Sequence, residues 1–426
     1  MDRSADGVVL LIGSGQQLYR QYLVEDASQR TPLWLIDAGV ATWQRPFVVG
    51  SSTVDMLDSA RSVPDEKALF EAAAEVSRTH RVLGVFTYDE ALVIATAHIA
   101  ERLGLAGCTV EGADRCRNKH RTRQALTEAG LPQPTFALAA TAAEAARAAE
   151  TIGYPVVLKP RGMGASIGVV RAGDAAELEA AFAVAEHASF IGPPSFEGGV
   201  LVEEFMVGPE ISVDGAVAAG TYSPLFLARK ELGLEPYFEE VSHVVDGADQ
   251  RLDDPELRHV LAEAHRVLGV QDGITHAEVR LTSKGPVVIE VNARLGGDLI
   301  PYLGKLATGI DPGQVAVDVA TRTPLRLEPL RQICAGIRFL YPPRDCRVLD
   351  ISVPEVGDVP GLVAARAMVA PGRSVRLPPR AHIGRYAYVI CTADQPVACA
   401  ARLENAAARI TLNHEPLELA LADERA

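Results

Sequence analysis

The chain has few cysteines, and they are scattered. Six occur in 426 residues, with no Cys-x-x-Cys pair and no histidine at metal-ligand spacing. This pattern excludes a zinc ribbon or a disulfide framework and is typical of reduced, buried thiols. A long apolar run is also missing, because the run at residues 8–12 is too short for a secretory signal or a membrane span. We therefore expect a cytoplasmic protein with no membrane partner.

An excess of basic residues is missing as well. The 41 lysines and arginines face 55 aspartates and glutamates, which gives a formal net charge of −14. The average field of such a chain repels nucleic acids and anionic membranes, so neither is an expected partner. Any anionic ligand must meet local positive charge, which makes single lysines and arginines beside glycines informative.

The dinucleotide-binding fingerprint lacks its third glycine. Gly13-Ser14-Gly15 follows an apolar strand, and Asp37 lies further on, but Leu18 occupies the last glycine position of Gly-x-Gly-x-x-Gly. We interpret the segment as a tight turn from a strand into a helix, and we expect no nicotinamide cofactor.

The length and composition suit a globular protein of two or three packed units, with 48% hydrophobic and 23% charged residues. Apolar strands at 8–12, 33–36 and 82–86 alternate with helical stretches, which predicts a small doubly wound parallel sheet. The middle of the chain predicts antiparallel hairpins with helices, and the last part predicts further strands and an Ala-rich helix. We expect a Rossmann-like domain at 1–112, two nucleotide-binding lobes at 113–322 and an α+β domain at 323–426.

Within the central region the expected helices and strands can be placed by their periodicity and by glycine and proline signals. The expected helices cover residues 118–129, 142–149 and 255–268. The expected strands cover residues 156–159, 169–170, 200–206, 211–217, 275–281 and 287–291. In the last region we expect strands at 335–340 and 387–392 and a helix at 396–410.

The most informative segment is a predicted hairpin near residue 284. Strand alternation places His276 and Glu278 on one face of the first strand, and Glu290 and Asn292 on one face of the second. Two carboxylates and an amide oxygen are ligands that Mg²⁺ prefers. Arg294 follows directly, beside glycines that allow close approach of an anion. A solvated sheet face is the alternative for the carboxylates alone.

A second cluster joins a lysine to a glycine-rich loop. The predicted strand ending at Lys159 leads into Gly162-Met163-Gly164-Ala165-Ser166 and then a returning strand. A fixed cation and a run of exposed N–H groups suit phosphate oxygens. The setting is a β-hairpin lid within residues 155–200, not the strand-to-helix setting of a Walker loop. A flexible surface hairpin is the alternative.

A third cluster lies around Glu203-Glu204-Phe205-Met206. An extended segment can offer backbone groups to an adenine edge, and Glu210 further on can accept bonds from ribose hydroxyls. Alone, these acidic residues also fit a solvent-facing turn.

Read in order, the clusters resemble the ATP-grasp superfamily over roughly residues 8–320. The residues that carry the resemblance are Lys119, Lys159, Glu203, Glu210, Glu278, Glu290, Asn292 and Arg294. The resemblance implies an ATP-grasp fold, α/β and α+β, with a doubly wound N-terminal domain, a two-lobed nucleotide-binding region and a C-terminal α+β domain.

The resemblance also implies roles. Lys119 and Lys159 would contact the phosphates of ATP, and the loop with Gly162, Gly164, Ala165 and Ser166 would close over them. Glu203 would lie near the adenine amino group. The segment of Glu204, Phe205 and Met206 would contact the edge of the adenine ring, and Glu210 would hold the ribose. The magnesium ligands would be Glu278, Glu290 and Asn292, with Mn²⁺ as a substitute ion.

Within the superfamily the chain looks most like the L-amino acid ligases. The similarity lies in Thr275-His276-Ala277-Glu278, in Glu290 to Asp298, and in Gly336-Ile337-Arg338 and Gly384-Arg385-Tyr386. It implies that Arg294, Lys159, His276 and His243 are catalytic candidates. Arg229 and Arg338 are further candidates for a substrate carboxylate, and an exposed strand histidine is an equal reading of His243.

The expected reaction is the ATP-dependent joining of a small carboxylate, such as an amino acid, to an amine through an acyl phosphate. Arg294 would stabilise the charge on the reacting carbonyl. The alternatives are an ATP-grasp carboxylase, a purine-pathway ligase and a regulatory protein that binds ATP without turnover. Gly296-Gly297-Asp298 departs from the biotin carboxylase pattern at this point. The substrates stay open, and a homodimer is compatible with the sequence.

Overall fold

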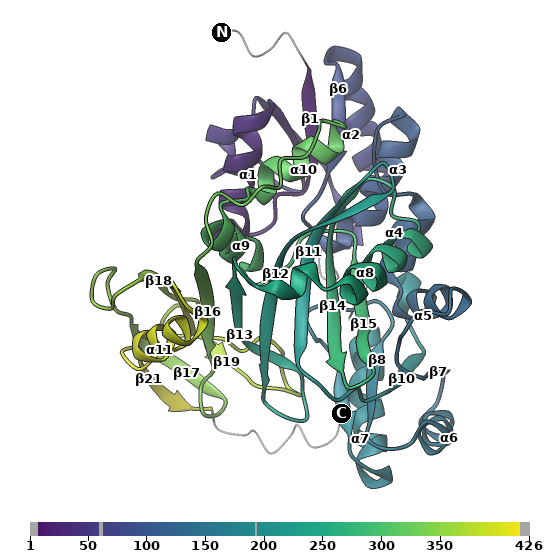
Figure 1. Ribbon diagram of the computed structural model, residues 1–426, viewed down its shortest axis with the longest axis vertical. Coiled ribbons are helices and arrows are strands. Elements are labelled where there is room, and N and C mark those ends of the chain that lie inside the picture. Colours follow the sequence, from purple (N-terminus) through teal and green to yellow (C-terminus); the bar gives the residue numbers. More distant parts are fainter. Residues whose placement is uncertain (1–6, 59–62, 192–193, 418–426) are drawn as a thin grey trace.

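The computed structural model describes residues 7–58, 63–191 and 194–417. Its main elements form three sheets with helices packed on them (Figure 1). The N-terminal sheet is parallel, a small antiparallel sheet carries the glycine-rich hairpin, and a large antiparallel sheet runs through the centre of the molecule.

The N-terminal sheet has the strand order β3-β2-β1-β6. Its strands are β1 (Val8–Ile12), β2 (Leu33–Asp37), β3 (Gly50–Thr53) and β6 (Val82–Phe86). The helices around it are α1 (Gln17–Arg30), α2 (Glu66–Thr79) and α3 (Val93–Leu103). The doubly wound parallel sheet expected from alternating strands and helices is thus present.

A distant helix completes this unit. Helix α10 (Pro312–Ala320) lies beside α1 in Figure 1, although the two are far apart in sequence. The approach is close, because a Cβ added to Gly84 would lie 2.4 Å from the carbonyl oxygen of Ala320. Glycine is therefore needed in this strand of the sheet for α10 to pack.

The small sheet has the order β7-β10-β8-β9 and is antiparallel. Its strands are β7 (Phe136–Ala139), β8 (Val156–Pro160), β9 (Val170–Ala172) and β10 (Val200–Glu204), with helices α6 (Ala142–Ile152) and α7 (Ala175–Ser189). Strands β8 and β9 pair in register from Val156 with Ala172, so the glycine-rich loop is the tip of a β-hairpin, as expected.

The large sheet has eight strands and continues across residue 322, where we expected a separate domain to begin. Its strands, in spatial order, are β15 (Gly285–Asn292), β14 (Gly273–Thr282), β11 (Glu210–Ala218), β12 (Thr221–Gly233), β13 (Glu239–Asp246), β16 (Cys334–Leu340), β20 (Ala387–Ala393) and β18 (Leu362–Ala367). Strand β13 pairs with β16, so β16, β20 and β18 of the C-terminal part extend the sheet that carries the site.

The remaining helices cover this sheet and link it to the other units. They are α4 (Val110–Arg117), α5 (Lys119–Glu128), α8 (Pro255–Leu268), α9 (Ile300–Thr308) and α11 (Pro396–Ala407). Smaller elements are β4 (Met56–Asp58), β5 (Val63–Pro64), β17 (Cys346–Ser352), β19 (Ser374–Val375), β21 (Thr411–Pro416) and the 3₁₀ turns η2 (Arg45–Phe47), η3 (Glu90–Leu92), η4 (Pro194–Phe196) and η5 (Gln250–Asp253).

Local signals explain the best-defined boundaries. The Asp254 side chain accepts the N–H of Glu256, Pro255 fills the first helical position, and Gly269 ends α8 in a left-handed conformation. These bounds agree with the expected helix at 255–268. Helix α4 was not predicted from the sequence. Four of its eight residues are charged, so the apolar face that would indicate a helix is short.

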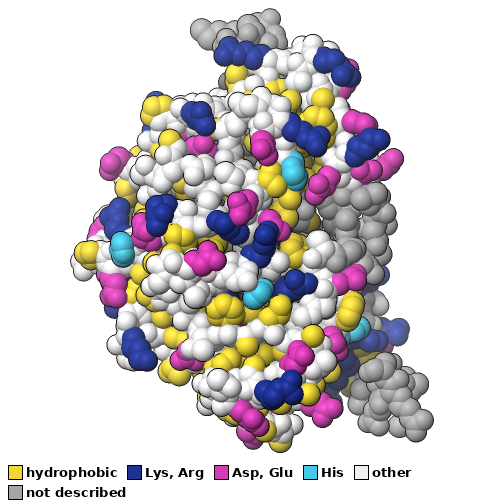
Figure 2. Space-filling model, turned by 90° about the vertical axis from the view of Figure 1, so that its right-hand side faces the viewer, with side chains coloured by type: hydrophobic (Ala, Val, Ile, Leu, Met, Phe, Trp, Pro, Cys, Tyr) yellow, Lys and Arg dark blue, Asp and Glu magenta, His cyan; other side chains and the backbone are white. Residues whose placement is uncertain are grey.

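The surface shows no single dominant charge on the face in Figure 2, where acidic and basic side chains are interspersed with apolar ones. Within the described residues, no helix combines the length and the apolarity that crossing a membrane requires.

Candidate active site

A cleft opens between the small sheet and the large sheet, where the lid hairpin faces strands β14 and β15. Residues of the C-terminal part, Ile383 and Arg385, also line it. All the predicted site residues line this cleft except Gly162 and His243. Gly162 packs under the lid, because a Cβ there would lie 2.5 Å from the Phe196 ring, and His243 lies behind the cleft wall, fully buried.

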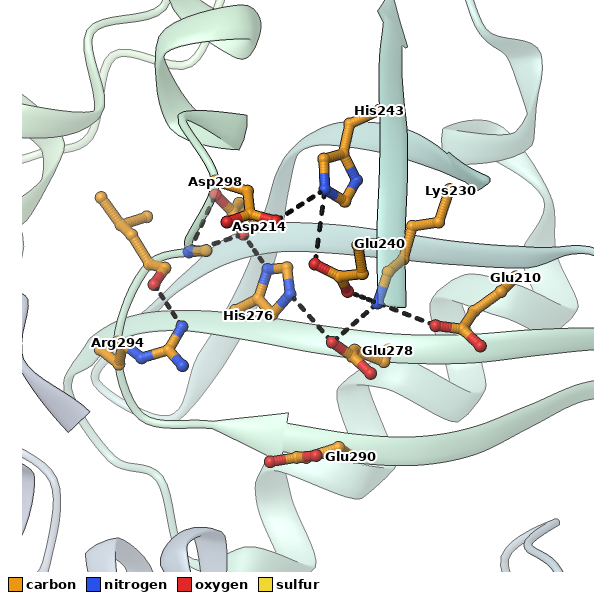
Figure 3. Close-up of polar contacts among 12 residues, drawn as sticks. Glu210, Asp214, Lys230, Glu240, His243, His276, Glu278, Glu290, Arg294 and Asp298 are labelled. Carbon is orange, nitrogen blue, oxygen red and sulfur yellow. Dashed lines mark hydrogen bonds and ion pairs between the residues drawn. The ribbon is translucent and has the colours of Figure 1, made fainter. Parts of the chain in front are cut away.

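The hairpin of β14 and β15 brings the expected metal ligands together. In its register Glu278 lies opposite Glu290, and His276 lies opposite Asn292. Residues directly opposite in an antiparallel pair share a face, as Figure 3 shows for the two glutamates. The sequence prediction of two carboxylates and an amide on one side of a hairpin is thus realised in the geometry.

Each of these three ligands keeps an oxygen without a partner among the described residues. Glu290 uses Oε1 to bind the Lys119 Nζ at 2.9 Å, and Glu278 uses Oε1 to bind the Lys230 Nζ at 2.9 Å. Their Oε2 atoms and the side-chain amide of Asn292 have no hydrogen bond or ion pair within residues 7–58, 63–191 and 194–417. Free oxygens on two carboxylates and an amide fit a hard divalent cation.

Lys119 connects Glu290 on the large sheet to the backbone of the lid. The Asn118 side chain caps α5, which places Lys119 at its first turn. The Lys119 Nζ donates to the Met163 carbonyl at 2.7 Å as well as to Glu290. A cation at this position lies between the lid backbone and the carboxylates, where phosphate oxygens are expected.

Glu203 is a buried counter-charge for two cations. Its carboxylate, 1% exposed, accepts from Arg123 Nε at 2.6 Å and pairs with Lys159 Nζ at 2.7 Å. Burial would raise the pKa of Glu203, but Arg123 and then Lys159 outweigh it and lower the pKa to about 2. Both oxygens are therefore occupied, and Glu203 fixes Lys159 in the cleft. Arg123 was not predicted, since an arginine inside a helix carries no local signal of a buried partner.

In the segment after β10, where Glu204 and Met206 were expected to contact adenine, the Glu204 N–H is already used within the fold. The Glu204 N–H donates to the Thr135 carbonyl at 2.8 Å, and the Glu204 carboxylate accepts from the Thr135 hydroxyl at 3.1 Å. The Met206 N–H makes no hydrogen bond to any described residue. Met206 lines the cleft, so this N–H is available to an acceptor on a flat ligand. Glu210 pairs with Lys230 and Arg280, each at 2.8 Å.

The lid is joined to the C-terminal part through a histidine. The Gly168 N–H donates to His382 Nε2 at 3.4 Å, and His382 Nδ1 lies 3.3 Å from Glu239 Oε1. Glu239 is buried and also accepts from the Tyr341 hydroxyl at 3.0 Å. These contacts hold the lid tip, where Ala165 and Ser166 take left-handed backbone conformations, against the rest of the site.

A buried lysine that was not predicted lies at the centre of the acidic residues. Lys230, 1% exposed at its side chain, pairs with Glu210, Glu240 and Glu278. Figure 3 shows it among these carboxylates. Burial would lower the pKa of Lys230, but the three carboxylates raise it well above the ordinary value. The only signal in the sequence was a lysine in a region of predicted strands. Such a lysine does not by itself identify the carboxylates that pair with it.

Arg294 is held by a glutamate of the N-terminal unit. Its Nε lies 2.6 Å from Glu90 Oε2, and the second oxygen of Glu90 binds Arg117 Nη1 at 3.0 Å. Burial would raise the pKa of Glu90, but Arg294 and Arg117 lower it to about 2. Glu90 was not predicted. It follows β6 at the carboxyl edge of the parallel sheet, which is where such sheets bind ligands, and this position could have identified it.

His276 is part of a buried pair. Its Nδ1 donates to Asp214 Oδ1 at 2.5 Å, and the Gly296 N–H donates to both Asp214 oxygens. Burial would lower the pKa of His276, but Asp214 and Glu278 raise it to about 9. At neutral pH the imidazole is therefore a cation beside Glu278. Gly296 must be glycine, because a Cβ there would lie 2.8 Å from the His276 ring.

A second histidine, on strand β13, contacts the loop after Arg294, which Arg385 of the C-terminal part also binds. His243 Nε2 lies 3.3 Å from Asp298 Oδ2 and 3.4 Å from Glu240 Oε2. Arg385 binds both oxygens of Asp298, at 2.6 and 2.7 Å. This bidentate pair fixes Asp298, whose backbone has a φ of 52°. His243 is thus a buried residue, and the alternative of an exposed strand histidine is wrong.

The two other arginines considered for a substrate lie elsewhere. Arg229 pairs with Asp249 at 2.8 Å on an exposed surface, and Arg338 pairs with Glu231 and Glu404. Neither lines the cleft. The arginine of the C-terminal part that does line the cleft is Arg385, whose guanidinium is bound by Asp298.

The buried triad of Glu203, Arg123 and Lys159 predicts a pH-dependent stability. The folded pKa of about 2 lies below the roughly 4.3 of an unfolded chain, so the carboxylate stabilises the fold above about pH 4.3 and this contribution is lost as the pH falls toward 2. Glu203→Gln should cost about 3–5 kcal/mol at pH 7, because two cations lose their buried partner. Urea unfolding of the unchanged protein and the variant should show that the difference between their free energies of unfolding becomes smaller as the pH falls from 5 to 3.

The neighbouring carboxylate provides the control for this experiment. Glu204→Gln removes a carboxylate bonded only to Thr135, and we expect a change within about 0.5 kcal/mol. Equal effects of the two substitutions would contradict the assignment of Glu203 as the buried counter-charge.

The contact between His382 and the lid predicts a change in local opening. In His382→Ala the Gly168 N–H loses its acceptor, so hydrogen exchange at residues 164–169 should become faster while the core strands keep their rates. His259→Ala, an exposed histidine on α8, is the control. Unchanged exchange at the lid in His382→Ala would show that the C-terminal part does not hold it.

Comparison with known proteins agrees with this geometry. Residues 152–302 match the model of an ATP-grasp domain, and residues 338–415 match the L-amino acid ligase C-terminal domain 2. The solved L-amino acid ligase of Bacillus licheniformis superposes with a TM-score of 0.78 at 23% identity, covering 96% of this chain and 99% of that one.

Curated relatives are similar over shorter lengths. The uncharacterized protein y4rH of Sinorhizobium fredii is 30% identical over 319 residues, which are 72% of this chain and 63% of that protein. The alanine–anticapsin ligase of Bacillus subtilis is 29% identical over 274 residues, 60% of this chain and 57% of the ligase. The chain thus spans somewhat less than two thirds of the length of these relatives. It contains an ATP-grasp domain at residues 152–302 and an L-amino acid ligase C-terminal domain 2 at residues 338–415, and its fold is that of a solved L-amino acid ligase.

Proposed function

We propose that this protein is an ATP-dependent ligase that joins a small carboxylate, an amino acid, to an amine through an acyl phosphate, with release of ADP and phosphate. The observation that carries the proposal is the set of free oxygens on Glu278, Glu290 and Asn292, which face a cleft that also holds Lys119, Lys159 and Arg294. Relatives support it, since they include an alanine–anticapsin ligase and a dapdiamide A synthase.

We propose that the nucleotide lies along the cleft from Met206 to the lid. The adenine edge would accept from the Met206 N–H, and Glu210 would receive the ribose hydroxyls. Lys119, Lys159 and the lid from Gly164 to Ser166 would surround the phosphates. Glu278, Glu290 and Asn292 would hold Mg²⁺, or Mn²⁺ in its place, which supplies charge neutralisation for the phosphates when bound.

The reaction needs two displacements at adjacent centres. An oxygen of the donor carboxylate attacks the γ-phosphorus, and the bond to the bridging oxygen breaks so that ADP leaves with the electron pair. The amine nitrogen then attacks the acyl carbon, loses a proton, and phosphate leaves. Arg294, aligned by Glu90, would stabilise the negative oxygen on this carbon.

In this proposal His276 positions neighbouring groups and does not act as a general base. Its Nδ1 is held by Asp214 at 2.5 Å and its Nε2 lies 3.6 Å from Glu278, so both ring nitrogens already face a carboxylate. Paired with Asp214, it would supply fixed positive charge beside Glu278 and hold the loop that begins at Arg294.

The parts of the chain divide this work. We propose units at residues 1–112, 113–322 and 323–426, in which the first supplies Glu90, the second the nucleotide site, and the third Arg385 and His382. We also propose a cytoplasmic location, since the reaction needs ATP, and a homodimer as the assembly.

Product analysis tests the reaction class. With pairs of amino acids, we expect amino-acid-dependent release of ADP and phosphate and, with hydroxylamine as the amine, formation of a hydroxamate. ADP release with bicarbonate alone would favour the carboxylase alternative, and release dependent on an amino-ribosyl phosphate would favour the purine-pathway alternative. Formation of AMP and pyrophosphate, or no turnover with any pair, would contradict the proposal.

The metal assignment predicts the effect of one substitution. Glu290→Gln removes a charged oxygen ligand and the partner of Lys119, so the Mg²⁺ concentration at half-maximal activity should rise by at least about tenfold. Glu263→Gln, which changes a half-buried glutamate of α8 outside the cleft, is the control. A Mg²⁺ dependence like that of the unchanged protein would remove Glu290 from the metal site.

A further inference from the structure

Glu239 is a buried carboxylate at the start of β13, and groups from three residues of the C-terminal part point at it. Its side chain lines the cleft, although the residue is only 2% exposed. The His382 Nδ1 lies 3.3 Å from its Oε1, and the Ile383 N–H donates to both of its oxygens, at 3.2 and 3.1 Å. The Tyr341 hydroxyl lies 3.0 Å from its Oε2. Glu239 therefore joins the nucleotide-binding region to the C-terminal part.

No lysine or arginine neutralises this carboxylate within the described residues. The other carboxylates of the site that are mostly buried, Glu90, Glu203 and Asp298, each pair with an arginine. The ion-pair partner of Glu239 is His382, which is charged only when it is protonated. Burying a carboxylate without a permanent cation destabilises a fold. This cost indicates that Glu239 does more than hold two parts of the chain together.

The lid is bound to the surroundings of Glu239 at two places. At its tip, the Gly168 N–H donates to His382 Nε2 at 3.4 Å. A ring nitrogen that accepts carries no proton, so the proton of the neutral ring is on Nδ1 and is donated to Glu239. The returning strand β9 is bound to residues 236–237, just before Glu239, by a hydrogen bond of 3.0 Å and a β-bridge. A change in the orientation of Glu239 therefore reaches the lid.

The same carboxylate is linked to the other end of the cleft. The Tyr341 hydroxyl accepts from Arg385 Nε at 2.9 Å, and its own proton is directed to Glu239, which is a stronger acceptor than the neighbouring backbone carbonyl. Arg385 binds both oxygens of Asp298, in the loop that follows Arg294, and both of these residues line the cleft. We call Tyr341, Arg385 and Asp298 the substrate wall.

We propose, on the basis of the ligase function above, that Glu239 is a positioning residue that couples closure of the lid over the nucleotide to the arrangement of the substrate wall. The two oxygens of a carboxylate share one side-chain orientation, so the bonds to His382 and to Tyr341 are made or lost together. A donor that fixes the wall therefore reduces the free-energy cost of closing the lid, and a nucleotide that closes the lid reduces the cost of ordering the wall. Nucleotide and donor then bind cooperatively.

The experiment measures how a donor amino acid changes the affinity for nucleotide. Titration calorimetry gives the Kd of AMP-PCP with Mg²⁺, with and without the amino acid that supports hydroxamate formation. AMP-PCP cannot transfer its terminal phosphate, so only binding is measured. In the unchanged protein the donor should lower this Kd by roughly 5- to 100-fold, the usual range for two coupled sites. In Glu239→Gln the ratio of the two Kd values should fall to about twofold or less, because the amide has one acceptor oxygen in place of two.

Two further variants test the route of the coupling. Tyr341→Phe removes the hydroxyl between Glu239 and Arg385. It leaves the contact between His382 and the lid, so the Kd ratio should fall while hydrogen exchange at residues 164–169 keeps its rate without ligand. In His382→Ala the Kd ratio should fall as well, but exchange at the lid should become faster.

Tyr386→Phe is the matched control. Tyr386 is a mostly buried tyrosine of the C-terminal part that does not line the cleft, and burial is the only cause that raises the pKa of its hydroxyl. This variant should keep the full Kd ratio of the unchanged protein. Thermal unfolding midpoints of all variants show whether the fold is kept, and a lower midpoint with the full ratio would make Glu239 a structural residue only.

The outcomes separate this assignment from the ligase function. If hydroxamate forms but the donor does not change the Kd of AMP-PCP in the unchanged protein, the coupling is wrong and the ligase function stands. The full Kd ratio in Glu239→Gln or in Tyr341→Phe would also contradict the assignment. Absence of AMP-PCP binding together with absence of hydroxamate would overturn both.

Discussion

The ion pair between Arg294 and Glu90 joins the two halves of the site. Arg294 follows the strand that carries Glu290 and Asn292, whereas Glu90 follows the last strand of the N-terminal sheet. Because both side chains are mostly buried and Arg117 shares the carboxylate, neither charge can reorient without losing a partner. The N-terminal unit therefore sets the position of the arginine that faces the reacting carbonyl in the proposed reaction.

The same pattern recurs through the cleft, where charged side chains are fixed by opposite charges that are mostly buried. Glu203 fixes Lys159, Asp214 fixes His276, and Asp298 is fixed by Arg385. Preorganised charges of this kind cost little reorganisation when negative charge develops on a substrate. Lys230 has three carboxylates around it, and its positive charge offsets the repulsion among the acidic residues near the proposed metal ligands.

The sequence predicted the parts of the site that local patterns encode. Strand alternation was enough to place Glu278, Glu290 and Asn292 on one face, and a lysine before glycines was enough to locate the lid. Glu90, Arg123 and Arg385 were missed because their partners lie 204, 80 and 87 residues away, and single-residue patterns carry no information on such pairs. The continuous sheet across residue 322 was missed for the same reason, since the pairing of β13 with β16 is set by packing.

The central claim is that a carboxylate of the substrate becomes an acyl phosphate in this cleft. It is tested most directly with a donor amino acid labelled with ¹⁸O in its carboxylate, followed by mass analysis of the phosphate released during amide formation. The account predicts one labelled oxygen atom in each phosphate, because the bond between the acyl carbon and that oxygen breaks in the second step. Unlabelled phosphate, or label found in AMP, would contradict it.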